Sequence, residues 1–127
     1  MLFQIEASGV SADTAIELFW PAFDAEPEGR AYADTVVRGV AGELAGLDAR
    51  ITAASSHWRI ERMARVDRNV LRLGTWEILH SADVPRAVIL DEAVELAKEF
   101  GTEESSAFVN GVLNRIAENA GRKDAVR

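Results

Sequence analysis

Residues 66–116 read VDRNVLRLGTWEILHSADVPRAVILDEAVELAKEFGTEESSAFVNGVLNRI, and the apolar residues of this stretch decide the fold. They recur every three or four positions, the spacing that places side chains on one face of an α-helix. The tripeptide at residues 83–85 and Gly101 interrupt the pattern as turn and stop signals. The stretch therefore predicts three helices: one over residues 60–80, one that ends at Phe100, and one that Thr102 caps.

Two glycines in these helices carry further information. The helix over residues 60–80 is apolar on more than one face, which predicts a place at the centre of a bundle. Gly74 within it would let a neighbouring helix approach closely. Asn110 and Gly111 interrupt the last helical period, and we interpret them as a second close contact between helices.

Working outward, the apolar residues from Tyr32 to Ile51 predict one long helix with a single apolar stripe. Two shorter helices are predicted nearer the N-terminus, over residues 1–8 and 11–20. Residues 24–30, with Pro27 and Gly29, are predicted to form a polar loop. No segment shows the convincing period-2 alternation of a strand.

A chain of 127 residues has the length of one domain. We expect an all-α fold, a single compact bundle of about six to seven helices over residues 1–127. The tail from about residue 121 is polar and is expected to fray. No apolar run approaches the roughly 20 residues of a membrane span, so we expect no membrane partner and a cytoplasmic protein.

The composition argues against catalysis. The chain has no cysteine, and its only histidines are His57 and His80. This excludes disulfides, thiolate metal sites and cysteine nucleophiles. No side chain stands beside a general base and an orienting group, and no glycine-rich phosphate loop is present. We expect no catalytic residue, no metal site and no cofactor.

The charge is unevenly distributed. The net charge is −7, with −6 over residues 1–57, +2 over residues 58–82 and −3 over residues 83–127. An acidic surface disfavours sequence-blind binding of nucleic acid and permits binding of a basic protein. The basic island carries arginines at positions 59, 62, 65, 68 and 72. Two interpretations stay open, local ion pairs on a helix or a partner surface.

Four ordered pieces of the chain resemble the NusB family of transcription antitermination factors. They are DRNVLRLG with the following WEIL, the DVP turn, DEAVELAKEFG and FVNGVLNRIA. The resemblance implies a small, all-helical, non-enzymatic RNA-binding factor. Family members pair with NusE, which is also a ribosomal small-subunit protein, and bind the boxA element of nascent rRNA leaders. The pair helps RNA polymerase, within its antitermination complex, to read through terminators.

The resemblance also implies site residues, each carried over by its place in the motifs. Phe3 matches an aromatic residue beside the RNA, whose ring could stack on a base. The other implied RNA contacts are Arg86, Glu104 and Phe108. The implied contacts to the basic partner NusE are Glu61 and Asp67. The alternative for Phe3 and Phe108 is a place in the core, and we assign Asn110 and Gly111 a structural role.

The chain departs from the family pattern at its start. MLFQIE matches the end of the family's first helix, whereas members usually begin with an arginine-rich segment that supplies phosphate contacts. Either the start codon lies further upstream or the protein is a shortened form. A shortened form motivates an alternative function, a protein–protein adaptor that keeps the NusE surface but has lost RNA binding.

Overall fold

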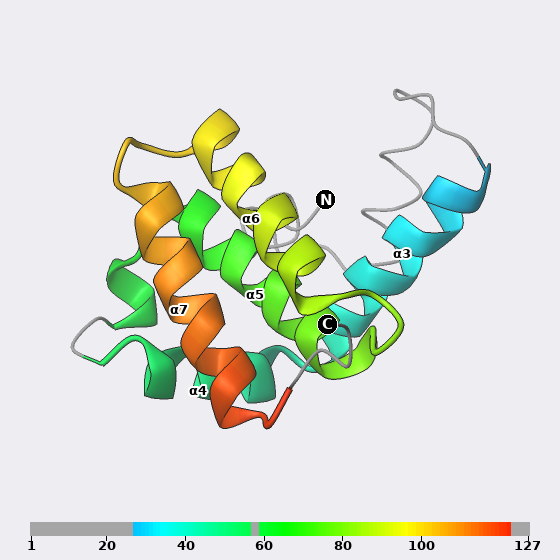
Figure 1. Ribbon diagram of the computed structural model, residues 1–127, viewed down its shortest axis with the longest axis horizontal. Coiled ribbons are helices and arrows are strands. Elements are labelled where there is room, and N and C mark those ends of the chain that lie inside the picture. The colour runs from blue at the N-terminus through cyan, green and yellow to red at the C-terminus, as the bar shows by residue number, and fades with distance from the viewer. Residues whose placement is uncertain (1–26, 57–58, 123–127) are drawn as a thin grey trace. The chain divides into compact units, whose positions relative to one another are not determined.

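The computed structural model describes residues 27–56 and 59–122, and these residues form helices and connections without a strand (Figure 1). In chain order the helices are α3 (Pro27–Gly42), α4 (Leu44–Ala54), the 3-10 helix η2 (Ile60–Arg62), α5 (Arg65–His80), α6 (Arg86–Phe100) and α7 (Ser105–Asn119). The predicted all-α class is confirmed. The helices predicted over residues 1–8 and 11–20 lie outside the described residues.

The chain divides into two compact units, residues 1–43 and residues 44–127. α3 belongs to the first unit, and α4 to α7 belong to the second. That residues 1–127 make one domain stays a prediction.

The first unit corrects two predictions. The loop predicted over residues 24–30 is already helical from Pro27, because proline suits the first position of a helix, where its missing N–H is not needed. The single helix predicted from Tyr32 to Ile51 is also wrong, because α3 ends at Gly42. The Glu43 N–H is shared between the carbonyl oxygens of Gly39 and Val40, at 3.1 and 3.3 Å, as is common at helix ends.

The second unit is built around α5, as the sequence predicts. α5 packs against α4, α6 and α7, and α7 in turn packs against α4 and α6 (Figure 1). The core between them is aliphatic, and its fully buried large side chains include Ile51, Leu71, Ile89, Leu113 and Ile116. Burial of such side chains contributes about 1.5–3 kcal/mol each to folding.

Gly74 lies where α5 meets α7, and the predicted close approach is confirmed. A Cβ atom built on Gly74 would lie 2.8 Å from Cδ1 and 3.0 Å from Cδ2 of Leu113. Leu113 is fully buried. The absence of a side chain at position 74 therefore sets how closely the two helices pack.

The boundaries of the three predicted helices are partly right. The turn at residues 83–85 and the stop at Gly101 are confirmed. The helix predicted over residues 60–80 is broken, because Met63 and Ala64 have extended backbones that separate η2 from α5. Met63 is 7% exposed and belongs to the core, so the extended segment places its side chain among apolar neighbours.

Thr102 is not the cap of the last helix. α7 begins at Ser105, and Glu104 holds the N-cap position. Instead, the Thr102 backbone N–H donates a 2.9 Å hydrogen bond to the Ser105 hydroxyl. This is one half of the reciprocal pattern of a capping box, in which a side chain accepts from the backbone N–H of the residue three positions earlier.

Arg122, near the start of the polar tail, is bound by the end of α5 and the turn that follows it. Arg122 donates to the carbonyl oxygens of Ile78 at 2.9 Å and Ser81 at 3.3 Å, and also to that of Val84. The guanidinium thus lies at the C-terminal end of α5, where a positive charge is favourable. Residues 123–127 lie outside the described part of the chain.

Among the helices that the structure describes, none combines the length and apolar character that crossing a membrane requires.

Candidate functional site

Two acidic side chains flank the junction between η2 and α5. Glu61 is exposed on η2, and Asp67 is half-buried in the first turn of α5. The Oδ1 atom of Asp67 is buried and has no hydrogen-bond partner among the described residues. A buried polar atom normally has a partner, so this oxygen is an exception, and its burial closes it to donors from another molecule.

The segment that carries Glu61, residues 55–64, is the α4–α5 connection. At its start, Nη1 of Arg115 on α7 donates to the Ala54 carbonyl oxygen at 2.8 Å and to the Ser56 hydroxyl at 3.0 Å. Ser56 has φ of 58°, a left-handed conformation that is uncommon outside glycine. Arg115 therefore joins the end of α4 to a strained residue of the connection.

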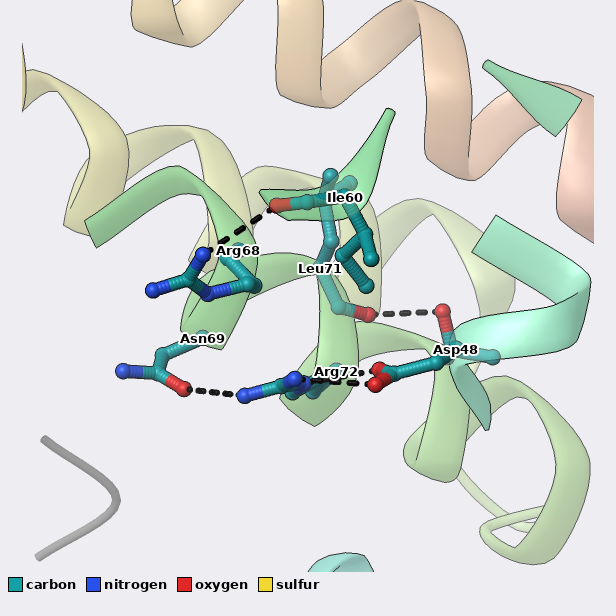
Figure 2. A network of polar contacts seen from close by, with 7 residues as sticks. Asp48, Ile60, Arg68, Asn69, Leu71 and Arg72 are labelled. Carbon is teal, nitrogen blue, oxygen red and sulfur yellow. Dashed lines mark hydrogen bonds and ion pairs between the residues drawn. The ribbon is translucent and has the colours of Figure 1, made fainter. Parts of the chain in front are cut away.

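A second arginine holds the connection further along. Nη1 of Arg68 on α5 donates to the Ile60 carbonyl oxygen at 3.1 Å, and this hydrogen bond joins α5 to the first residue of η2 (Figure 2). Burial lowers the pKa of Arg68, and the nearby charge of Arg72 lowers this pKa further. Both causes disfavour the charged form of the guanidinium.

Arg72 forms a bidentate ion pair with Asp48 of α4. Its Nε and Nη2 atoms donate to the two carboxylate oxygens at 2.8 and 2.9 Å, and Nη1 donates to Asn69 Oδ1 at 3.3 Å (Figure 2). The side chains of Arg72 and Asp48 are 10% and 24% exposed. The interpretation of the basic island as local ion pairs on one helix is thus wrong for Arg72, which ties α5 to α4.

Glu104 and Phe108 lie at the start of α7. Glu104 is exposed at the N-cap position, where its carboxylate accepts a 3.3 Å hydrogen bond from the Thr102 hydroxyl. Phe108 is half-buried and packs against the core. The Glu104 carboxylate can accept a hydrogen bond from another molecule. The Phe108 ring packs partly against the core and is partly exposed at the surface.

Arg86, the first residue of α6, is engaged inside the molecule. Its Nη2 atom donates to Asn114 Oδ1 at 2.9 Å and to the Asn114 carbonyl oxygen at 3.3 Å. The same guanidinium lies 3.8 Å from the carboxylate of Glu118. These contacts hold α6 against the last turns of α7. Phe3, the fourth predicted RNA contact, lies outside the described residues.

Gly111 corrects the interpretation of the Asn110-Gly111 pair. Gly111 is exposed, and a Cβ atom built on it would meet nothing within 4 Å. The predicted close contact between helices therefore exists at Gly74 and not at Gly111.

No pattern in the sequence pointed to two residues of this region, Asp48 and Arg115. Asp48 is one acid among many on an acidic chain, and its partner lies 24 positions away. Arg115 binds a backbone carbonyl oxygen 61 positions away, and such an acceptor has no residue type to reveal it.

The NusB family model matches residues 1–118. The chain belongs to the NusB family. The family resemblance of the four motifs is thereby confirmed over nearly the whole chain.

Curated NusB relatives match closely along their length. Transcription antitermination protein NusB of Sorangium cellulosum is 65% identical over 127 residues, which are 100% of this chain and 91% of the relative. The protein of the same name from Myxococcus xanthus is 44% identical over 120 residues, with 91% of this chain and 86% of the relative covered.

A solved NusB structure shares the fold. T. maritima NusB is 39% identical in sequence and superimposes with a TM-score of 0.82, covering 92% of this chain and 82% of that chain. The NusB relatives are named transcription antitermination proteins.

Proposed function

We propose that this protein is a transcription antitermination factor that pairs with NusE and binds boxA-type RNA in nascent rRNA leaders. In this role it acts within the antitermination complex of RNA polymerase. One observation carries the proposal: over its whole length the chain is 65% identical to a relative named transcription antitermination protein NusB.

RNA is proposed to contact Phe3, Arg86, Glu104 and Phe108. Glu104 is exposed at the start of α7, where its carboxylate can accept hydrogen bonds from base amino groups. The half-buried ring of Phe108 is suited to stacking on a base through its exposed part. Arg86 is proposed to contribute positive charge to the RNA surface while its guanidinium also donates to Asn114 Oδ1.

NusE is proposed to contact Glu61 and Asp67. NusE is basic, so exposed carboxylates are suitable contacts. The exposure of Glu61 and the half-exposed position of Asp67 in the first turn of α5 support this assignment.

Fluorescence anisotropy with a labelled boxA RNA tests the proposal. We expect the protein with NusE to bind boxA RNA more tightly than a scrambled RNA of the same composition. Binding of NusE without any preference for boxA would replace the proposal with the adaptor function. Absence of binding to both NusE and boxA RNA would refute both functions.

Charge reversal tests the partner residues. Glu61→Arg and Asp67→Arg should each weaken NusE binding in calorimetry, because they place a positive charge against a basic protein. Asp83→Arg is the matched control, since Asp83 is exposed in the turn before α6. An unchanged affinity for both variants would remove these residues from the partner surface.

A further inference from the structure

Part of the basic island forms an exposed surface, which we call the arginine surface: Arg59, Arg62 and Arg65. Arg59 precedes η2, Arg62 ends it, and Arg65 begins α5, and all three are exposed. Within the part of the chain that the structure describes, the side chains of Arg59 and Arg62 have no hydrogen-bond or ion-pair partner. Local ion pairs therefore do not account for these two arginines, which leaves the interpretation of a partner surface.

The 3-10 turn places Arg59 and Arg62 together and separates them from Glu61. The Arg62 N–H donates to the Arg59 carbonyl oxygen at 3.0 Å, and the Met63 N–H donates to that of Ile60 at 3.2 Å. In a turn of this kind residues i and i+3 lie one above the other. Ile60 and Met63 accordingly share the side that packs on the core. Arg59 and Arg62 share an exposed side, about 6 Å apart along the axis.

Arg68 joins this turn to α5. Its Nη1 atom donates to the Ile60 carbonyl oxygen at 3.1 Å (Figure 2). Together with the buried side chain of Met63, this hydrogen bond holds η2 against the second unit. The backbone beneath Arg59 and Arg62 is thus attached to the fold on the side opposite to the exposed guanidinium groups.

Positive charge at this place is unfavourable for the protein by itself and beside its proposed partner. Residues 59–65 hold three arginines and one acid in a chain of net charge −7. Arg65 is the first residue of α5, where the helix dipole disfavours a cation. The arginine surface also borders Glu61 and Asp67, so its charges would repel basic NusE. An anion bound at this surface would remove that repulsion.

We propose that the arginine surface binds the phosphate backbone of RNA, beside the NusE contacts and without regard to base sequence. This inference rests on the proposed function, which brings RNA and NusE to the protein. Guanidinium groups donate paired N–H bonds to phosphate oxygens, and phosphate contacts add affinity without sequence information. The surface is separate from the proposed RNA contacts Arg86, Glu104 and Phe108. RNA lying here would screen the arginines from NusE, so that RNA and NusE bind cooperatively.

Salt titration of RNA binding tests the phosphate contacts. The probes are a labelled boxA RNA and a scrambled RNA of the same length, each bound to the protein with NusE. Each phosphate contact contributes about 0.7 to the slope of log K against log salt, which amounts to about fivefold in affinity at 0.1 M salt. The double variant Arg59→Gln/Arg62→Gln should therefore lower the slope by about 1.4 and weaken binding by about 25-fold. Both RNAs should lose the same factor, so the preference for boxA should not change.

Two control variants separate phosphate binding from other effects. Arg62→Lys keeps the charge, so it should keep the native salt slope. Lys98→Gln removes a positive charge from α6, where Lys98 is 61% exposed, and should change RNA affinity by less than about twofold. Because all of these side chains are exposed, each variant should melt close to the native temperature.

NusE binding in the absence of RNA gives a readout of opposite sign. Removing Arg59 and Arg62 removes repulsion of a basic protein, so the double variant should bind NusE about twofold more tightly at low salt. If these arginines instead met acidic groups of the partner protein, the same variant would bind NusE more weakly. Calorimetry without RNA distinguishes the two.

The outcomes separate this inference from the proposed function. An unchanged affinity and salt slope in the double variant, with the boxA preference intact, would overturn the phosphate role and leave the proposed function standing. Weaker NusE binding without RNA, or a loss confined to boxA RNA, would also overturn it, by assigning the arginines to the partner protein or to base recognition. Absence of RNA binding by the native protein with NusE would overturn both.

Discussion

Replacing Gly74 by alanine tests the close contact between α5 and α7 that organises the second unit. Two opposing effects are expected. Alanine inside a helix is favoured over glycine by about 1 kcal/mol. The new methyl group, however, would lie 2.8 and 3.0 Å from the two terminal methyls of Leu113, whereas carbon atoms pack best at about 3.5–4.0 Å.

The free-energy cost of the steric overlap should exceed the gain from the higher helix propensity of alanine. Leu113 is fully buried and close-packed, so its methyls can move aside only by disturbing their neighbours. Overpacking of this kind costs about 1–3 kcal/mol. After the gain of about 1 kcal/mol, Gly74→Ala should lower the free energy of unfolding by up to about 2 kcal/mol.

Gly111→Ala is the matched control for this experiment. It makes the same change inside α7, where the new methyl group meets nothing within 4 Å. It should therefore raise the free energy of unfolding by about 0.5–1 kcal/mol. Urea denaturation followed by circular dichroism at the helical band measures both variants, and the slopes should match. Stabilisation of equal size in both variants would refute the reasoning.

Three further predictions concern individual side chains. Asp48→Ala removes both carboxylate acceptors of Arg72 and should lower the free energy of unfolding by on the order of 2–4 kcal/mol in urea denaturation. The exposed Asp83→Ala should lower it by less, and equal losses in the two variants would contradict this prediction. Arg122→Met should lower the free energy of unfolding by about 1–3 kcal/mol, because it leaves carbonyl oxygens at the end of α5 without their donor. An unchanged melting temperature would show that these hydrogen bonds do not stabilise the fold. Phe108→Ala should lower the melting temperature and also weaken boxA binding of the folded protein by about 1–3 kcal/mol; a loss of stability with unchanged affinity would assign the ring to the core alone.

The helices that sequence predicted best are those whose signals are local. α6 ends before Gly101, and a proline-containing turn precedes its start, as read directly from the chain. The close approach at Gly74 followed from a small residue on a helix that is apolar on several faces. The bounds of α6 depend on residues within a few positions of one another, and the position of Gly74 in α5 is visible in the apolar pattern of the same helix.

Other features depend on signals that the sequence does not display. The apolar spacing continues across Gly42 and Glu43, so periodicity alone could not separate α3 from α4. Both Gly74 and Gly111 lie within helices, and only the packed structure distinguishes the glycine that meets a neighbour from the one that does not.

The polar contacts of the candidate site were the least predictable. Two of these contacts join residues that are distant in sequence: the ion pair of Arg72 with Asp48, and the hydrogen bond from Arg115 to the Ala54 carbonyl oxygen. Which acid or carbonyl oxygen an arginine meets is decided by the packing of whole helices. The family motifs identified candidate residues such as Asp67, but the arginines that hold the surrounding backbone emerge only from the structure.

Terminator read-through in reconstituted transcription tests the central claim most directly. RNA polymerase would transcribe a template carrying boxA upstream of a terminator, with NusE and the other antitermination factors present and this protein added or omitted. The account predicts that adding the protein increases the fraction of transcripts that pass the terminator, and that scrambling boxA abolishes the increase. An unchanged read-through fraction on the boxA template, with the protein folded and NusE present, would contradict it.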